Sequence, residues 1–189
     1  MVAVFDFKKF PRLTTRRLVL REITHDDARD IFAIRSDYEV TKYNSGAPLR
    51  FLEEAEDLVS RIISAYNDRR SVRWGITLRD SNHVIGMVGY NYWAREDNRA
   101  SVGYDLARAY WGNSIMPEAL QRVIQFGFEM MYLNRVEADC SVENEASARV
   151  LEKLGFQPEG RQREQYYEDG RYHDLLLFAL LRREFRMDE

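Results

Sequence analysis

The stretch from residue 99 to residue 142 decides the fold. It reads RASVGYDL (99–106), ARAYWGNSIMPEALQRVIQFGFEMMYLN (107–134) and RVEADCSV (135–142). Val136, Ala138 and Cys140 alternate with polar residues in the third segment, as in a strand with one buried face. In the middle segment apolar residues recur at helical spacing, and Pro117 fits only the first turn of a helix. We therefore expect a helix from about Ser114 to Met131 between two parallel strands.

The flanking sequence supplies the remaining elements. Upstream we expect a strand at 16–22, a helix after the cap residues 24–27, a second helix after Pro48, and strands at 72–78, 83–93 and 99–106. Downstream we expect a helix from Glu145 to Gly155 and strands at 161–167 and 173–181 joined by a turn at 168–170. The order β-α-α-β-β-β-α-β-α-β-β predicts an α+β fold with a mixed, mostly antiparallel sheet of about seven strands.

Composition bounds the class of protein. The 189 residues correspond to about one domain at roughly 150 residues per domain, and 45% of them are apolar. We expect an N-terminal arm at 1–14 and a single domain at 15–189. A net charge of −3 argues against nucleic-acid binding. No apolar run approaches the ~20 residues that cross a bilayer, and the single cysteine excludes an internal disulfide. The sequence predicts a soluble cytoplasmic protein without a membrane partner.

Chemistry is concentrated at the start of the long helix. The loop around Gly112 joins a strand end to a helix N-terminus, where unpaired N–H groups and the helix dipole favour an anion. The free N–H groups belong to Gly112, Asn113, Ser114 and Ile115, and a pyrophosphate would suit them. An ordinary strand-to-helix connection is the alternative interpretation.

The segment ENEASARVLEKLGF (143–156) opens a second candidate site. Asn144 is a good N-cap, and Ser147 stands one turn into the helix, where its hydroxyl can hydrogen-bond a leaving thiolate. The alternative is that Asn144 caps the helix and Ser147 bonds only backbone.

Together these segments resemble the GNAT superfamily of acyl-CoA-dependent N-acetyltransferases, closest to the ribosomal-protein N-terminal (alanine) acetyltransferase branch. The resemblance runs from about Thr15 to Phe185. Its segments are TTRRLVLREIT, GYDLARAYWGNSIMPEAL, LNRVEADCSVENEASARVLEKLGF and EDGRYHDLLLFALL. It implies a GNAT fold with helices on both faces of the sheet, a gap where strands 99–106 and 135–142 splay apart, and acetyl-CoA bound in that gap.

The resemblance also implies roles for individual residues. Leu106 would pair its backbone with the pantetheine arm, Asn144 would contact the CoA arm, and Ser147 would lie near the sulfur. The loop Trp111, Gly112, Asn113, Ser114 and Ile115 would present amides to the pyrophosphate. It departs from the family's usual Gly-x-Gly or Gly-x-Ala by having Ser114 in the third place.

Two further departures concern proton transfer. Many relatives have a tyrosine acid where this chain has Leu151, and others have a glutamate base where this chain has Ser101. The acid role then falls to Ser147 or water. A peptide α-amine with a pKa near 8 is about a tenth neutral at pH 7, whereas a lysine amine near 10.4 needs a base more. The absent glutamate therefore favours an α-amine acceptor.

The remaining candidates are weaker. Asp105 is a candidate base, with a solvated strand-end carboxylate as the alternative. Trp74, Asn91 and Trp93 are candidates for the substrate pocket, although alternation does not decide which face of 90–93 is core. Cys140 is expected to pack in the core, and the scattered histidines His25, His83 and His173 predict no metal site.

The sequence thus predicts direct transfer of an acetyl group from acetyl-CoA to a primary amine, with no covalent enzyme intermediate. The favoured acceptor is the N-terminal α-amine of a protein. A small-molecule or antibiotic amine, or a non-catalytic acyl-CoA-binding module, are the alternatives. Relatives are often dimers, and the choice between a monomer and a homodimer stays open.

Overall fold

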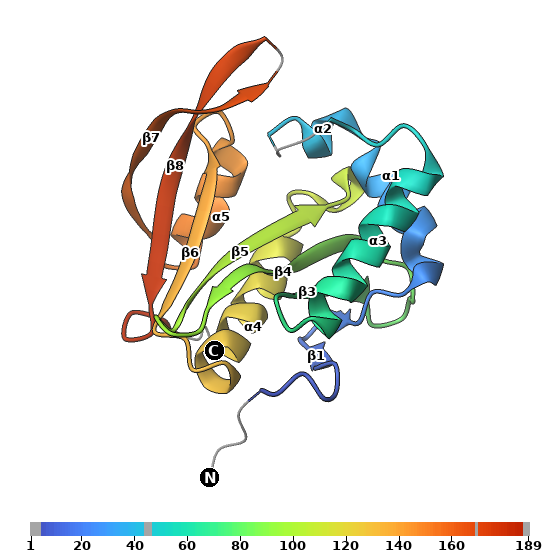
Figure 1. Cartoon of the computed structure of the whole chain (residues 1–189), viewed down its shortest axis with the longest axis horizontal. Coiled ribbons are helices and arrows are strands. Elements are labelled where there is room, and N and C mark those ends of the chain that lie inside the picture. Colours follow the sequence, from blue (N-terminus) through green and yellow to red (C-terminus); the bar gives the residue numbers. More distant parts are fainter. Residues whose placement is uncertain (1–4, 44–46, 169, 187–189) are drawn as a thin grey trace.

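The computed structural model describes residues 5–43, 47–168 and 170–186. Its centre is one eight-stranded sheet in the order β1-β2-β3-β4-β5-β6-β8-β7 (Figure 1). All neighbouring strands pair antiparallel except β5 and β6. The strands are β1 (Leu13–Thr14), β2 (Leu18–Arg21), β3 (Val72–Leu78), β4 (Gly86–Ala94), β5 (Arg99–Leu106), β6 (Arg135–Ser141), β7 (Gln157–Glu168) and β8 (Arg171–Leu181).

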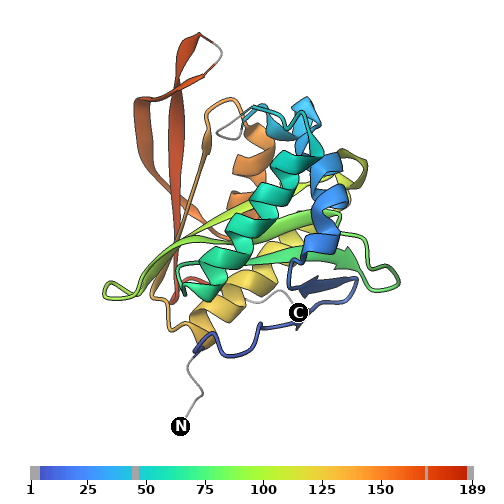
Figure 2. The ribbon, with the colours of Figure 1, turned by 45° about the vertical axis from the view of Figure 1, so that its right-hand side comes forward.

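Helices cover both faces of the sheet (Figures 1 and 2). On one face lie α4 (Ile115–Met130) and α5 (Glu145–Lys153), and on the other α1 (Ala28–Arg35) and α3 (Leu52–Asn67), with the short α2 (Tyr38–Thr41) at one end. The larger apolar cluster includes fully buried residues of α4 such as Leu120 and Ile124. A smaller cluster joins Ile31 of α1 to Val59 of α3. No helix in the described ranges is long and apolar enough to cross a membrane.

The parallel pair β5–β6 opens along its length. Its register includes only Arg99↔Arg135, Ala100↔Val136 and Ser101↔Glu137. Beyond Ser101, β5 continues beside β4 to Leu106, while β6 continues beside β8 to Ser141. The two halves of the sheet therefore diverge after three residue pairs, and this divergence is the splayed gap that the resemblance implies.

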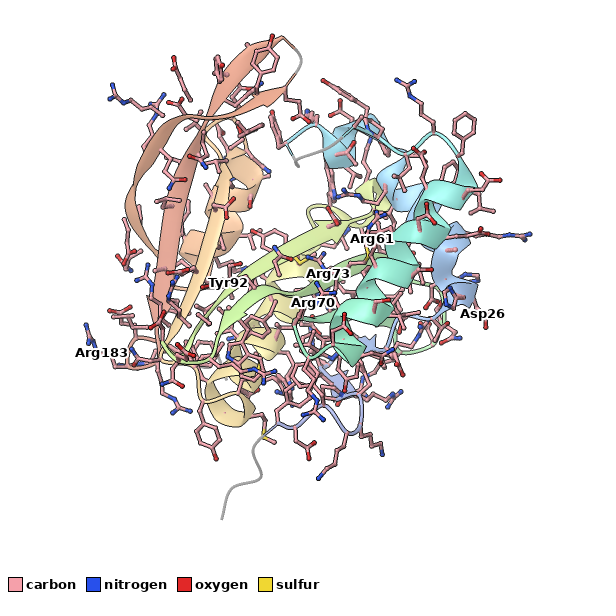
Figure 3. All side chains as sticks on the ribbon, in the orientation of Figure 1. Asp26, Arg61, Arg70, Arg73, Tyr92 and Arg183 are labelled. Carbon is pink, nitrogen blue, oxygen red and sulfur yellow. The ribbon has the colours of Figure 1, made fainter. Side chains whose placement is uncertain are left out.

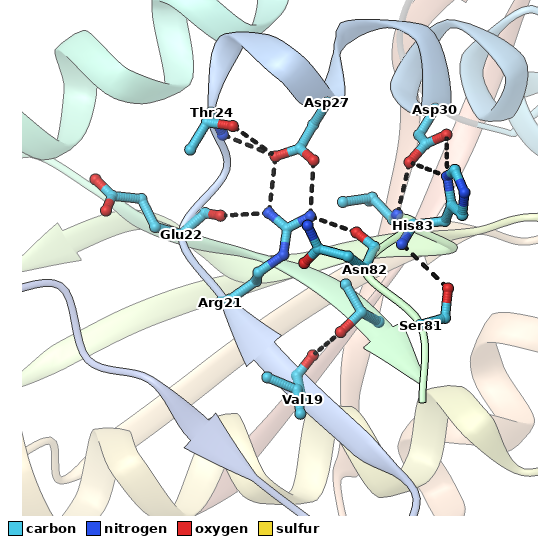
Figure 4. Close-up of polar contacts among 11 residues, drawn as sticks. Val19, Arg21, Glu22, Thr24, Asp27, Asp30, Ser81, Asn82 and His83 are labelled. Carbon is cyan, nitrogen blue, oxygen red and sulfur yellow. Dashed lines mark hydrogen bonds and ion pairs between the residues drawn. The ribbon is translucent and has the colours of Figure 1, made fainter. Parts of the chain in front are cut away.

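A buried ion pair fixes the first helix to the sheet (Figure 4). Arg21 of β2 donates to both carboxylate oxygens of Asp27, at 2.8 and 2.9 Å, and the N–H of Thr24 donates to the same carboxylate at 2.8 Å. Burial opposes ionisation of Asp27, but these hydrogen bonds outweigh it and lower the pKa of the carboxyl. On the next turn Asp30 accepts from the N–H of Val84.

The α+β architecture and the splayed gap are confirmed, with local differences. The predicted first helix is a short 3-10 turn at 25–27 followed by α1, and α2 was not predicted. The strand predicted at 83–93 begins at Gly86. In the predicted arm, Leu13 and Thr14 form β1. Phe5, Phe7 and Phe10 of the same segment pack against the core, because removing their apolar surface from water is favourable in free energy. Asp169 of the predicted turn lies outside the described residues.

Candidate functional site

A cavity of about 850 Å³ lies where the loop after β5 meets the first turns of α4 and α5. It is bordered by the end of β5, by the backbone of the loop and by one side of α5. Its lining includes Tyr104, Asp105, Leu106, Trp111, Gly112, Ser114, Ile115, Asn144, Ser147, Arg149 and Lys153. The cavity thus joins the two segments that the sequence singles out, and its size suits an extended ligand rather than an ion.

The loop backbone is shaped for an anion. Gly112 has φ +75° and Ser114, the N-cap of α4, has φ +55°. These left-handed residues turn the chain so that the N–H groups of Gly112, Asn113 and Ser114 donate to no acceptor within the described part of the chain. A Cβ on Gly112 would meet nothing within 4 Å, so space above the loop is open. Free donors, a helix N-terminus and an open approach fit the pyrophosphate of CoA.

The turn between β1 and β2 braces this loop. The Arg17 guanidinium donates to the carbonyl of Asn113 at 2.9 Å and to that of Ser114 at 3.1 Å. Glu118 in the first turn of α4 accepts from Arg17 Nε at 2.6 Å, from the Arg17 N–H at 2.9 Å and from Thr15 at 2.6 Å. Because these two carbonyls point to Arg17, the N–H groups of the same trans peptides, which belong to Ser114 and Ile115, point away from Arg17.

Two hydroxyls meet in the splayed gap. Asn144 caps α5 by accepting from the Ser147 N–H at 3.0 Å, which confirms the predicted cap. The Ser147 hydroxyl lies 2.7 Å from the hydroxyl of Tyr104, which comes from β5. Burial raises the pKa of Tyr104 well above its ordinary value, so the phenol keeps its proton. Burial likewise raises the pKa of Cys140 to about 11, which leaves a thiol rather than a thiolate beside Ser147.

A second cavity of about 560 Å³ continues from the first toward α1 and α3. It shares Tyr43, Tyr104, Asp105, Asn144 and Ser147 with the first cavity. Its other walls come from strands β3 to β8 and from helices α1 and α3. Its remaining lining includes Arg35, Leu58, Ile62, Arg73, Asn91, Gly103, Asp139, Cys140, Ser141 and Tyr166. A donor in the first cavity and an acceptor in the second would therefore meet at Ser147.

The structure brings most of the predicted donor-site residues together. Leu106, Trp111, Gly112, Ser114, Ile115 and Asn144 line the first cavity, whereas Asn113 is absent from that lining and contributes its backbone to the loop. The Leu106 carbonyl accepts from the indole N–H of Trp111 at 2.8 Å. The backbone of Leu106 is expected to pair with pantetheine, and its carbonyl is thus already bonded within the chain.

Only one of the three predicted pocket residues reaches the second cavity. Asn91 lines it, but Trp74 is fully buried on the α4 side, with its indole N–H donating to Pro11 at 2.6 Å. Trp93 stacks on Phe5 instead. A shift of register in β4 between Tyr90 and Tyr92 breaks the strict alternation that the sequence argument assumed. The placement of Trp74 and Trp93 in the pocket is therefore not supported by the structure.

Asp105 does lie at the junction of the two cavities, but its carboxylate is engaged. It accepts from Arg35 of α1 at 3.0 Å, and the side chains are only 6% and 18% exposed. The sequence alternative of a solvated strand-end carboxylate is wrong, because α1 covers this end of β5. Because of this ion pair, the Asp105 carboxylate does not provide the free base that the sequence suggested.

Sequence reasoning missed four residues at the site: Arg17, Arg73, Tyr104 and Asp139. For Tyr104 a signal existed, since its place in the strand 99–106 puts it on the same face as Leu106. The other three depend on which strands are neighbours, which a single sequence does not reveal. No cluster of three metal-ligating side chains occurs among residues that the structure describes.

Comparisons with known proteins agree with this geometry. A family model described as an acetyltransferase (GNAT) domain matches residues 17–157. The uncharacterised N-acetyltransferase YoaA of Bacillus subtilis (strain 168) is 36% identical over 173 residues, which are 92% of this chain and 98% of that protein. The ribosomal protein uS5 alanine N-acetyltransferase of Escherichia coli (strain K12) is 26% identical over 177 residues, covering 89% and 90% of the two chains.

A solved structure shows the same fold. RimL, a ribosomal L7/L12 alpha-N-protein acetyltransferase in complex with coenzyme A, superimposes with a TM-score of 0.81 at 21% identity, over 90% of this chain and 98% of that one. The extent of the family match and the identity to YoaA decide the assignment. The chain belongs to the GNAT family of acetyl-CoA-dependent N-acetyltransferases.

Proposed function

We propose that this enzyme acetylates the N-terminal α-amine of a protein or peptide. The observation that carries the proposal is the second cavity, which meets the donor cavity at Ser147 and reaches α1 and α3 on the opposite face of the sheet. An acceptor can therefore approach the thioester without displacing CoA. The similarity to the uS5 alanine N-acetyltransferase and to RimL supports a protein acceptor.

In the proposed reaction the neutral amine attacks the thioester carbonyl directly. The N–C bond forms, the C–S bond breaks, and the amine proton passes to water. The oxyanion is stabilised by a backbone N–H near Leu106. Ser147 donates a proton to the leaving CoA sulfur and regains one from Tyr104, whose phenol lies 2.7 Å away. Tyr104 is then reprotonated by solvent.

Asp105 has a different part in this proposal. Its ion pair with Arg35 ties the end of β5 to α1 where the two cavities join, so we assign it a positioning role. Cys140 takes no covalent part, because a thiol with a pKa of about 11 is a poor nucleophile at neutral pH.

The test measures CoA release and product mass with a matched acceptor set. The set comprises peptides with a free N-terminus, the same peptides with a blocked N-terminus and an internal lysine, and small primary amines. Acetylation of the free N-termini at rates at least tenfold above the lysine peptides supports the proposal. Comparable rates on lysine, turnover of small amines alone, or binding without any turnover would instead support the alternatives named from the sequence.

We also propose that the chain works in the cytoplasm as a homodimer. The hairpin of β7 and β8 extends beyond the helices (Figure 2), and its exposed Tyr167 and Tyr172 pack edge to face at 5.1 Å. Exposed aromatic pairs are typical anchors of interfaces. Light scattering on the purified protein and on Tyr167→Ser tests this, and a monomeric wild type contradicts it.

A further inference from the structure

The lining of the second cavity includes two oppositely charged side chains that come from different strands of the sheet. Four ionisable side chains with a formal charge line it: Arg35, Arg73, Asp105 and Asp139. Arg35 and Asp105 form an ion pair with each other. The charges that are left are one cation on β3 and one carboxylate on β6.

The Arg73 side chain is held by a hydrogen bond to a neutral neighbour rather than by an ion pair. Its guanidinium hydrogen-bonds the side-chain oxygen of Asn91 on β4, and among the described residues it forms no ion pair. Asn91 in turn lies flat over Gly103 of β5, where a Cβ would overlap the Asn91 amide. Gly103 and Asn91 thus hold Arg73 over the middle of the sheet. Asp105 attracts Arg73, but this carboxylate is already paired with Arg35, which repels Arg73.

Partial burial makes this charge costly. Arg73 is partly buried in the cavity lining, and desolvation lowers the pKa of its guanidinium. A partly buried cation without a carboxylate partner incurs part of this desolvation cost unless a ligand compensates it. The same cost is not incurred by Arg70, three residues earlier, which is exposed and paired with Asp68 at 2.8 Å (Figure 3).

Asp139 lies on the other side of the same cavity. It follows Ala138 on β6, beyond the last residue pair with β5, and adjoins Cys140, whose side chain interacts with Ser147. Its side chain is exposed at the cavity, no polar contact to its carboxylate occurs within the described ranges, and local desolvation raises its pKa. This carboxylate can therefore attract the ammonium form of an amine that enters the cavity close to Ser147.

We propose that the acceptor of this enzyme carries a carboxylate as well as its reactive amine, with the carboxylate bound by Arg73 and the amine held beside Asp139. This inference rests on the proposed function only in that the cavity is the acceptor site. For a peptide, the carboxylate belongs to an aspartate or glutamate at one of the first positions. Polyamines, which would place a second cation near Arg73, are excluded as preferred acceptors.

The experiment compares acids with their amides. Peptides identical except for Asp or Asn, and Glu or Gln, at position one, two or three are assayed for kcat/KM with saturating acetyl-CoA, beside free amino acids and their side-chain amides. We expect the acid to exceed its amide at least tenfold at one position. Arg73→Gln, which keeps a hydrogen-bonding group for Asn91, should abolish the preference mainly through KM. Arg70→Gln, the same charge change outside the cavity, should retain it.

A second readout does not depend on turnover. Calorimetric titration of the CoA-bound protein with N-acetyl-glutamyl and N-acetyl-glutaminyl peptides should show tighter binding of the acid, lost in Arg73→Gln. CoA affinity itself should be unchanged in that variant, which checks that it folds. Equal kcat/KM for acids and amides, equal product affinities, or a preference that survives Arg73→Gln overturns the inference. Turnover of acidic small amines but of no peptide overturns the proposed function and leaves this inference standing.

Discussion

Tyr104 and Ser147 place their hydroxyl groups 2.7 Å apart across the gap between β5 and β6. Tyr104 belongs to the half of the sheet that carries β1 to β5, and Ser147 belongs to the helix that follows β6. The pair therefore bridges the gap at the point where the two cavities meet. In the proposed mechanism this phenol supplies the proton that many relatives would supply from a tyrosine at the position of Leu151, which is fully buried here.

Removing the hydroxyl of Ser147 should slow the chemical step. We expect Ser147→Ala to lower kcat by about 10²-fold, within the range for a lost general acid, with little change in the KM for acetyl-CoA. Tyr104→Phe should lower kcat less, because Ser147 can regain its proton from water. Steady-state kinetics check this. A Ser147→Ala enzyme with wild-type kcat would remove Ser147 from the mechanism.

Substitution of Gly112 should weaken CoA binding. Any side chain at φ +75° is strained, and alanine there should cost about 1 kcal/mol of stability. Since the space above the Gly112 Cα is open, Gly112→Trp should fill it and raise the Kd for acetyl-CoA at least tenfold. Calorimetric titration measures this. Gly170→Trp is the control, because Gly170 also has a positive φ and open space but lies in the distant hairpin.

Loss of the Arg17 brace should affect the loop without unfolding the protein. Arg17→Gln removes the bonds to the carbonyls of Asn113 and Ser114, and we expect a Kd for CoA that is several-fold higher. Stability should fall by about 1 kcal/mol, because Arg17 is partly exposed. Arg16→Gln, one residue earlier, serves as the control. An unchanged Kd in Arg17→Gln would show that the loop holds its conformation without the brace.

The ion pair of Arg21 and Asp27 should give stability a pH dependence. The folded pKa of Asp27 is lowered below its ordinary 3.8, so its contribution is complete above about pH 5 and is lost as pH falls through the folded pKa. Asp27→Asn should cost about 2 kcal/mol at pH 7 and progressively less below pH 4. Urea unfolding at several pH values tests this. The exposed neighbour variant Asp26→Asn should show no such convergence with the wild type.

A glycine in α4 should tolerate no side chain. A Cβ at Gly127 would overlap the hydroxyl of Tyr90, which donates to the Val123 carbonyl at 2.9 Å. Gly127→Ala should therefore destabilise the protein by about 1–3 kcal/mol despite the better helix propensity of alanine. Adding Tyr90→Phe should recover part of that loss, since the ring carbon and Leu133 still crowd the site. Additive effects of the two changes in thermal unfolding would contradict this contact.

Sequence patterns were sufficient for some features and insufficient for others. Pro117 located the start of α4, and Asn144 located that of α5, because each residue has one acceptable place relative to a helix. Trp93 was misplaced because its position depends on the shift of register in β4, which no residue type announces. Trp74 was misplaced because the sequence does not show that its face of β3 packs against α4. Arg73 and Asp139 lie on strands separated by β4 and β5, so their shared cavity follows only from the order of the sheet.

The short pairing of β5 with β6 has a consequence for the whole molecule. Only three residue pairs join these strands, so the sheet consists of two parts, β1 to β5 and β6 to β8, with little direct pairing between them. A pantetheine chain bound in the gap would take the place of the missing strand partners. Bound CoA would then fix the angle between the two parts of the sheet before the amine binds, without changing the structure of either part.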